Sequence, residues 1–190
     1  MGYSPTTKEI LIDQLRAVFV ARGYDGATLS NLARAANLSK ASLYHHFPGG
    51  KPEMAAALVR HAIADLQRKA FQHLSGSQPP QQRVIAFIDG FFAYTDAGQS
   101  DCLLAVLNHH NTATGNTASQ QQTITAQFDD WHATLASVFE EAGAKQKKAA
   151  RQAHDLLAAL YGALLMAKMH HQPQLFVGAV KRIRKRFKTL

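Results

Sequence analysis

The clearest structural signal in this chain lies in residues 28–51, TLSNLARAANLSKASLYHHFPGGK. Thr28 stands directly before an apolar-periodic run, in the position of a helix N-cap. From Leu29 to Ala36 the apolar residues recur three and four positions apart, which predicts a short helix with one apolar face. Asn37 follows it and tolerates the left-handed backbone of a tight turn. We therefore expect the first helix to end there.

A second short helix is predicted from Lys40 to His46. Ser39 stands at its N-cap position, and the helix is expected to end before Pro48-Gly49-Gly50. Two short helices joined by a turn of three residues form a helix-turn-helix motif, whose second helix enters the major groove of DNA. The stretch therefore predicts a nucleic-acid-binding function.

The two sides of this second helix differ in chemistry. At about 100° per residue, Leu43 and Phe47 fall on one side, where they face the first helix. The opposite side carries a methyl group, a hydroxyl and an imidazole, from Ala41, Ser42 and His45. Such short side chains let a helix lie deep in a groove, where Ser bonds to base edges and Ala contacts the thymine methyl. Lys40 and Tyr44 flank this side and suit phosphate oxygens.

A helix beginning near residue 7, then RGYDGATLSNLARAANLSKASLYHHF, then a Lys that opens a long helix, resembles the N-terminal domain of TetR-type transcriptional regulators. The resemblance covers roughly residues 7–60. Asn37 stands where the family most often has Gly, and both residues suit a left-handed turn. The Pro-Gly-Gly-Lys loop looks one residue longer than usual. In this it resembles the LmrA/YxaF-type branch of the family.

The resemblance implies an all-α, two-domain regulator with about nine helices. Its expected domains are a DNA-binding domain over residues 1–52 and a ligand-binding and dimerisation domain over residues 53–190. By family habit, the regulator represses transcription until a small molecule releases it from a palindromic operator. The predicted DNA-binding residues are Thr28, Ser39, Lys40, Ala41, Ser42, Tyr44, His45 and Lys51.

Composition agrees with a nucleic-acid partner but does not require one. The 190 residues carry a formal net charge of +8, which favours nucleic acid or anionic membrane surfaces. Cys102 is the single cysteine, so an intrachain disulfide is excluded, as is usual in a reducing cytosol. The sequence contains neither a signal peptide pattern nor an apolar run of ~18 residues. We therefore expect a cytoplasmic protein without a membrane partner.

The histidines and short motifs of the sequence bear on metal binding and catalysis. Three adjacent pairs, His45-His46, His109-His110 and His170-His171, occur among the ten histidines. Neighbours on a helix point about 100° apart and cannot both ligate one ion from a single face. The sequence has no G-x-S-x-G, P-loop or dinucleotide-binding motif. We therefore predict no metal site, no cofactor and no enzymatic activity.

Beyond the motif, helical patterns alone are found. A long helix is predicted over residues 51–74, ended by the turn-rich stretch 75–80. Further helices are predicted at residues 81–97, 102–110, 119–141 and 146–171 and after Pro173, with a loop over residues 111–118. The basic run 181–188 is most simply the solvated face of the last helix.

The aromatic residues of the second domain allow two interpretations. Core packing accounts for most of them, and some of them can line a cavity between helices. The resemblance implies a small apolar or aromatic effector in such a cavity. Its predicted lining is Phe87, Phe91, Asn108, His110, Phe128, Trp131 and Tyr161.

The last two helices are rich in Leu and Ala. A monomer can bury these stripes internally, whereas in TetR-type regulators the corresponding helices pair with a second copy. The residues predicted for a homodimer interface are Leu157, Leu160, Leu164, Phe176, Val180 and Ile183. Two alternatives to the regulator remain open. One is a DNA-binding protein without sequence preference or effector, and the other is a helical enzyme or carrier with a hairpin that only resembles the motif.

Overall fold

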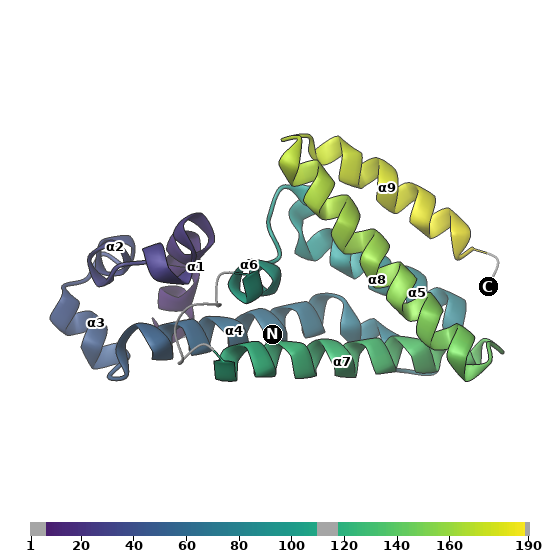
Figure 1. The fold of residues 1–190 in the computed structure, drawn as a ribbon, viewed down its shortest axis with the longest axis horizontal. Coiled ribbons are helices and arrows are strands. Elements are labelled where there is room, and N and C mark those ends of the chain that lie inside the picture. Colours follow the sequence, from purple (N-terminus) through teal and green to yellow (C-terminus); the bar gives the residue numbers. More distant parts are fainter. Residues whose placement is uncertain (1–6, 110–117, 189–190) are drawn as a thin grey trace. The chain divides into compact units, whose positions relative to one another are not determined.

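A computed structural model of the chain describes residues 7–109 and 118–188, with side chains for residues 8–107 and 120–188. In this part the chain forms nine α-helices and two 3-10 helices and contains no strand, which confirms the predicted all-α fold (Figure 1). The elements are α1 (Thr7–Gly26), α2 (Leu29–Ala35), α3 (Lys40–His46), α4 (Gly50–Lys69), η1 (Phe71–Leu74), α5 (Pro80–Tyr94), η2 (Asp96–Gly98), α6 (Leu103–His109), α7 (Ala118–Glu141), α8 (Gln146–Met169) and α9 (Pro173–Arg186).

The chain packs as two compact units. Unit 1 comprises residues 1–63 and 102–124, and unit 2 comprises residues 64–101 and 125–190. The sequence predicts a functional boundary at residue 52, between a DNA-binding domain and a ligand-binding and dimerisation domain. These units describe packing and not function, so that boundary stays a prediction. Both α4 and α7 contribute residues to each unit.

Unit 1 is built on the apolar stripes of its helices. Its fully buried side chains include Leu15, Phe19, Leu32, Leu43, Phe47, Met54 and Leu58. Two contacts of charged or titratable side chains join α1 to α4. Lys8 pairs with Glu53 at 3.7 Å, and the His61 ring nitrogen lies 3.5 Å from the Asp13 carboxylate. Helix α6 packs against α1. The two helices of the motif are thereby held on a shared core.

Helix α1 is interrupted near its end by a glycine. Gly23 has φ 65°, which interrupts the regular helix, and a short helical turn continues to Gly26. Tyr24 follows the break and is buried against Phe19, with ring centroids 6.3 Å apart. Tyr24 therefore packs in the core of unit 1.

The end of the long helix differs from the prediction. Helix α4 stops at Lys69 rather than Leu74, because Ala70 leaves the helical region at φ −123° and η1 follows. Gly90 of α5 lies directly against this point, where a Cβ atom would be 1.9 Å from the Lys69 carbonyl oxygen. The sequence prediction missed this break because its packing partner lies some twenty residues further along the chain.

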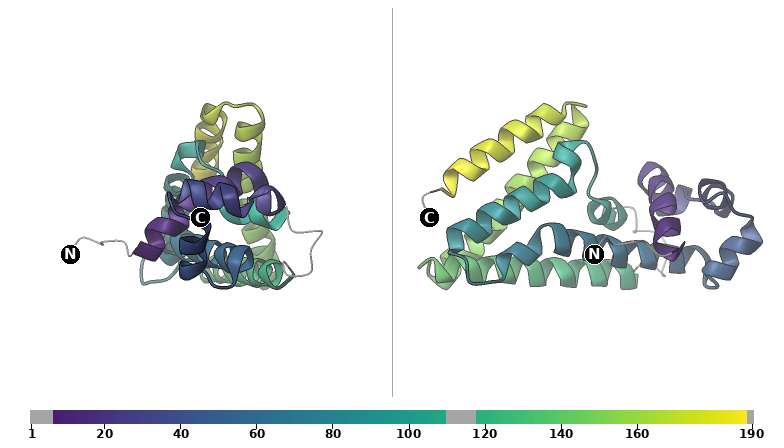
Figure 2. Two further views of the ribbon diagram at one scale, coloured as in Figure 1. Left: turned by 90° about the vertical axis from the view of Figure 1, so that its left-hand side faces the viewer. Right: turned by 180° about the vertical axis from the view of Figure 1, so that it is seen from behind.

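In unit 2, α8 and α9 lie side by side and run in opposite directions (Figures 1 and 2). Phe87, Phe91 and Phe176 are fully buried here. Arg83 is buried too, and it donates to the Leu74 carbonyl oxygen at 2.9 Å and pairs with Glu141. The predicted loop at residues 111–118 lies largely outside the described residues.

Candidate functional site

Both helices of the motif are capped by the residues that the sequence predicts. The Thr28 hydroxyl accepts a hydrogen bond from the Asn31 N–H at 3.2 Å. The Ser39 hydroxyl accepts one from the Ser42 N–H at 3.0 Å. Each cap satisfies an otherwise unpaired donor at a helix start and stabilises the helix by about 1 kcal/mol. The N-cap predictions are confirmed.

The turn between these helices closes in a Schellman motif. Asn37 has φ 51°, the left-handed conformation that its side chain tolerates. The Leu38 N–H donates to the Ala33 carbonyl oxygen at 2.9 Å, and the Asn37 N–H donates to that of Arg34 at 3.1 Å. These two bonds fix the direction in which α3 leaves α2.

Helix α3 has one buried side and one open side. Leu43 and Phe47 are fully buried, as the helical periodicity predicts. Tyr44 is 44% exposed and Ser42 is half-buried, with its hydroxyl 2.9 Å from that of Ser39. Lys40, Ala41 and His45 are exposed. The open side therefore presents short polar side chains with a cation and a phenol at its edge.

The loop after α3 supports Tyr44. Gly50 has φ 66° and is buried, and a Cβ atom there would lie 3.3 Å from the Tyr44 ring. The Gly49 N–H donates to the Glu53 carboxylate at 2.8 Å, which ties the loop to the first turn of α4. A glycine at position 50 thus lets the ring rest against the backbone.

Lys51 has a partner that the sequence did not reveal. Its ammonium group donates to the Tyr24 carbonyl oxygen at 3.0 Å and lies 4.4 Å from the Tyr24 ring centroid. Both contacts are inside unit 1, so this amine holds the start of α4 to the end of α1. Burial, and then the charge of Asp25, raise the pKa of the Tyr24 phenol above 10.0, so this ring stays neutral at physiological pH.

An open cleft of about 460 Å³ lies beside the exposed side of α3. It is bordered by the start of α2, by Tyr44 and by the start of α4. Among its lining residues are Thr28, Leu29, Tyr44, Gly50, Lys51 and Pro52. Helix starts carry a positive dipole end that attracts an anion. The Asp25 carboxylate also lines this cleft and opposes an anion there.

The predicted effector-cavity residues form a packed ring cluster in unit 2. Phe87, Phe91 and Trp131 are buried, and Phe128 and Tyr161 are half-buried. Tyr161 contacts both Phe91 and Phe128, with centroids 5.0 and 5.6 Å apart. None of these five aromatic side chains lines the cleft beside α3. Of the two polar residues predicted, His110 lies outside the described residues and Asn108 is described by its backbone alone.

Two further residues complete this cluster, and the sequence did not predict that they belong to it. Phe71 stacks on Trp131, with centroids 4.3 Å apart and planes 4° from parallel. Gln67, near the end of α4, accepts a hydrogen bond from the Trp131 indole N–H at 2.6 Å. The sequence shows one continuous helical pattern over residues 51–74. That pattern does not distinguish either residue from its neighbours.

The predicted homodimer interface needs a correction. Five of its six residues are buried within the single chain, and an enclosed side chain has no surface left for a partner. They are Leu160, Leu164, Phe176, Val180 and Ile183, whereas Leu157 is half-buried. The apolar stripes of α8 and α9 that drew the prediction pack against their own chain.

The exposed large apolar side chains of these helices are different ones. They are Leu165, Met166, Met169 and Leu175, with exposed fractions of 60%, 49%, 67% and 43%. Ala158 and Gly162 are exposed on the same side of α8 as the first three. We call Ala158, Gly162, Leu165, Met166 and Met169 the outer apolar face of α8.

Across residues 7–109 and 118–188, no three His, Cys, Asp or Glu side chains come together as an ion would require. None of the helices described is both long enough and apolar enough to cross a bilayer.

Two protein-family models match the chain. Residues 11–58 match the bacterial regulatory proteins of the tetR family, and residues 80–181 match the LmrA/YxaF-like transcriptional regulator C-terminal domain. The chain is also similar to the HTH-type transcriptional regulator LmrA of Bacillus subtilis (strain 168). The two are 30% identical over 88 residues, 46% of each chain. The chain spans about half the length or less of the curated relatives it matches.

Solved structures share the fold over most of the chain. A TetR transcriptional regulator from Legionella pneumophila superposes with a TM-score of 0.80 at 20% identity, over 99% of this chain and 100% of that one. AibR, solved in complex with isovaleryl coenzyme A and operator DNA, superposes with a TM-score of 0.65 at 20% identity, over 83% and 86%. With both parts of its length matched by family models, the chain belongs to the tetR family of transcriptional regulators, in the LmrA/YxaF-like group.

Proposed function

We propose that the chain is a homodimeric repressor that acts in the cytoplasm, binds a palindromic operator through α3 and leaves it when a small apolar effector binds. The observation that carries the proposal is the open side of α3, capped by Ser39 and held by the buried Leu43 and Phe47. Helices of this kind read base edges in the major groove. AibR, whose fold is similar, was solved with both an acyl coenzyme A and operator DNA.

The proposed contacts divide into two classes. Ala41, Ser42 and His45 face the bases, while Lys40 and Tyr44 lie at the edge, where phosphates run. The cleft beside Tyr44 is proposed to receive the sugar–phosphate backbone, with the starts of α2 and α4 on either side. Lys51 is proposed to position this wall, because its ammonium group is bonded to Tyr24.

The two classes are expected to respond differently to substitution. Lys40→Ala should weaken binding to specific and random duplexes alike and lower the salt slope by roughly one, because a phosphate contact is lost. His45→Ala should lower the specific-to-random ratio by about 1–3 kcal/mol, because a base contact is lost. Fluorescence anisotropy with a palindrome from the DNA flanking the gene measures both quantities.

Controls for this experiment come from the same chain. Tyr44→Phe removes the hydroxyl but keeps the ring that rests on Gly50, so it should weaken both duplexes without unfolding the loop. Lys145→Ala removes an equal charge outside α3 and should change neither duplex. Unchanged operator affinity in both Lys40→Ala and His45→Ala would contradict the role proposed for this helix.

The effector is proposed to bind at the ring cluster, by moving the half-buried Phe128 and Tyr161 aside. The cluster is aromatic, so the ligand should be apolar and planar, in line with the family's effector site. Trp131 reports on this event, since its indole is bonded to Gln67 and stacked on Phe71. Helix α4 continues from Gln67 back to Gly50, beside Tyr44.

Compounds that change Trp131 emission saturably are expected to release operator as well. By thermodynamic linkage, operator should weaken their binding by the same factor, commonly about 5- to 150-fold. Gln67→Ala should reduce this factor, whereas Gln72→Ala, an exposed amide on η1, should leave it unchanged. Titrations of Trp131 emission with and without operator measure it. Saturable emission changes that leave operator affinity untouched would show that this cluster is not the switch.

The same binding measurements test the two alternatives. A DNA-binding protein without sequence preference would bind the palindrome and a random duplex equally. A helical enzyme or carrier would show no salt-dependent DNA binding at all.

A further inference from the structure

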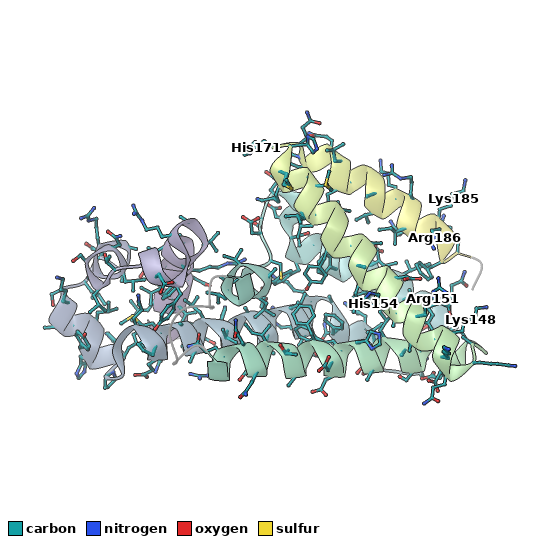
Figure 3. All side chains as sticks on the ribbon, in the orientation of Figure 1. Lys148, Arg151, His154, His171, Lys185 and Arg186 are labelled. Atoms are coloured by element: carbon teal, nitrogen blue, oxygen red, sulfur yellow. The ribbon has the colours of Figure 1, made fainter. Side chains whose placement is uncertain are left out.

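The positive charge of this protein is concentrated away from the helix-turn-helix. Residues 145–190 contain eleven of the 21 Lys and Arg residues and a single acidic residue, Asp155. Lys148 and Arg151 extend from the first turns of α8, and Lys185 and Arg186 from the last turn of α9 (Figure 3). These ends come together because the two helices are antiparallel. The proposed function makes no use of this charge.

A cleft of about 360 Å³ opens between these helix ends and the end of α7. This volume lies in the range of sites for small ligands. Its apolar wall comes from Phe139, Leu156, Ile183 and Phe187. The ring centroids of Phe139 and Phe187 lie 5.7 Å apart. Lys148 and Arg186 line the same cleft. The cleft therefore combines a hydrocarbon surface with two cations.

Two cations and one amide oxygen of the cleft lack partners among the described residues. Within residues 7–109 and 118–188, neither Lys148 nor Arg186 has a carboxylate within 4 Å. The buried Gln152 side-chain oxygen also has no hydrogen-bond partner in that part of the chain. The amide orientation is interchangeable, so Gln152 can donate as well as accept. Asp155 lines the cleft too, but it pairs with Arg151 at 3.9 Å.

The start of α8 strengthens this pattern. Lys145 is its N-cap residue and makes no capping hydrogen bond, and its first turn contains no acid. Lys147 and Lys148 follow within that turn, although the positive end of a helix dipole disfavours cations. A bound anion would compensate both the unpaired N–H groups and the lysines.

We infer that this cleft binds an amphipathic organic anion: a carboxylate or phosphate head group at Lys148, Arg186 and Gln152, with a short hydrocarbon body against Phe139, Leu156, Ile183 and Phe187. Arg186 provides a planar pair of donors that suits either head group, and Lys148 adds a compact charge. The site is separate from the ring cluster, because no residue of that cluster lines the cleft. It is also separate from the outer apolar face of α8, which lies in the other half of that helix.

Isothermal titration calorimetry of the full chain with sodium octanoate and with monooctyl phosphate tests the inference. At least one of them is expected to bind at one site per chain, and more tightly than 1-octanol or inorganic phosphate. Lys148→Ala and Arg186→Ala should each weaken it about 10-fold, since each removes a charge-assisted hydrogen bond. Ala159→Phe, which places a ring in the cleft, should abolish it. Which of the two probes binds more tightly identifies the head group.

The matched controls are Lys147→Ala and Lys185→Ala. Each removes an exposed cation next to a lining one without touching the cleft, so each should retain wild-type affinity. Four results would overturn the inference: neither probe binds, Lys148→Ala and Arg186→Ala bind like wild type, inorganic phosphate binds as tightly as the octyl compounds, or the controls lose as much affinity as the lining variants. The lining cations are exposed, so circular dichroism should show all these variants folded except where Ala159→Phe disturbs α8.

Discussion

A chain carrying Leu165→Glu and Met169→Glu is expected to sediment as a 20.8 kDa monomer at micromolar concentration, whereas the natural sequence is expected to sediment at twice that mass. At about 100° per residue the outer apolar face of α8 points directly away from its buried stripe of Leu156, Leu160 and Leu164. Contiguous exposed apolar surface of this kind marks an interaction site. A two-fold dimer would place two copies of the face together, and four buried carboxylates would then oppose association.

Operator binding should fall with the dimer. Two α3 helices reading half-sites about 34–36 Å apart gain affinity from acting together. Losing the second contact is expected to lower operator affinity at least about 100-fold. Fluorescence anisotropy at fixed salt measures this loss, and the variant should retain wild-type helicity, because both substituted side chains are more than half exposed.

Ala133→Glu is the matched control, since it adds the same charge at an exposed position of α7 and should leave the dimer intact. Sedimentation of the natural sequence as a monomer, or of the double variant as a dimer, would refute the assignment of this face. Leu164→Glu is unsuitable as a test, because Leu164 is buried in its own chain and the variant would unfold.

Gly90→Ala is expected to lower the free energy of unfolding by about 3 kcal/mol or more. The added methyl carbon would lie 1.9 Å from the Lys69 carbonyl oxygen and 2.8 Å from the Ala70 Cα atom. Both are backbone atoms, so α5 has to move as a whole. That movement would separate the rings of Phe71 and Phe87, which are tilted against each other with centroids 4.8 Å apart. Urea denaturation at one fixed protein concentration measures the change.

Gly178→Ala serves as the control for this prediction. Its added methyl carbon would meet only the end of the flexible Arg182 side chain, at 3.4 Å. A glycine inside a helix costs about 0.5–1 kcal/mol relative to alanine, so stability should be unchanged or slightly raised. Equal stabilities of Gly90→Ala and the natural sequence would show that α5 does not pack this closely in solution.

The helix-turn-helix was predictable in detail because its signals are local. Thr28 and Ser39 cap helices whose first donors lie three residues away, and Asn37 needs only its own backbone preference. The inward side of α3 follows from the helical period alone, which correctly buried Leu43 and Phe47. The remaining helices follow the same period, so the all-α class needed no tertiary information either.

Only the tertiary structure shows which partner each apolar stripe and each polar group contacts. The sequence identified apolar stripes on α8 and α9 but not their partner, and packing placed Leu160, Leu164 and Ile183 inside the chain. The Lys51 ammonium group donates to the carbonyl oxygen of Tyr24, 27 residues earlier in the chain. The break at the end of α4 packs against Gly90, twenty-one residues after Lys69. In each case the deciding contact joins residues far apart in the chain, and a pattern of period 3.6 shows only that a side chain is buried, not what buries it.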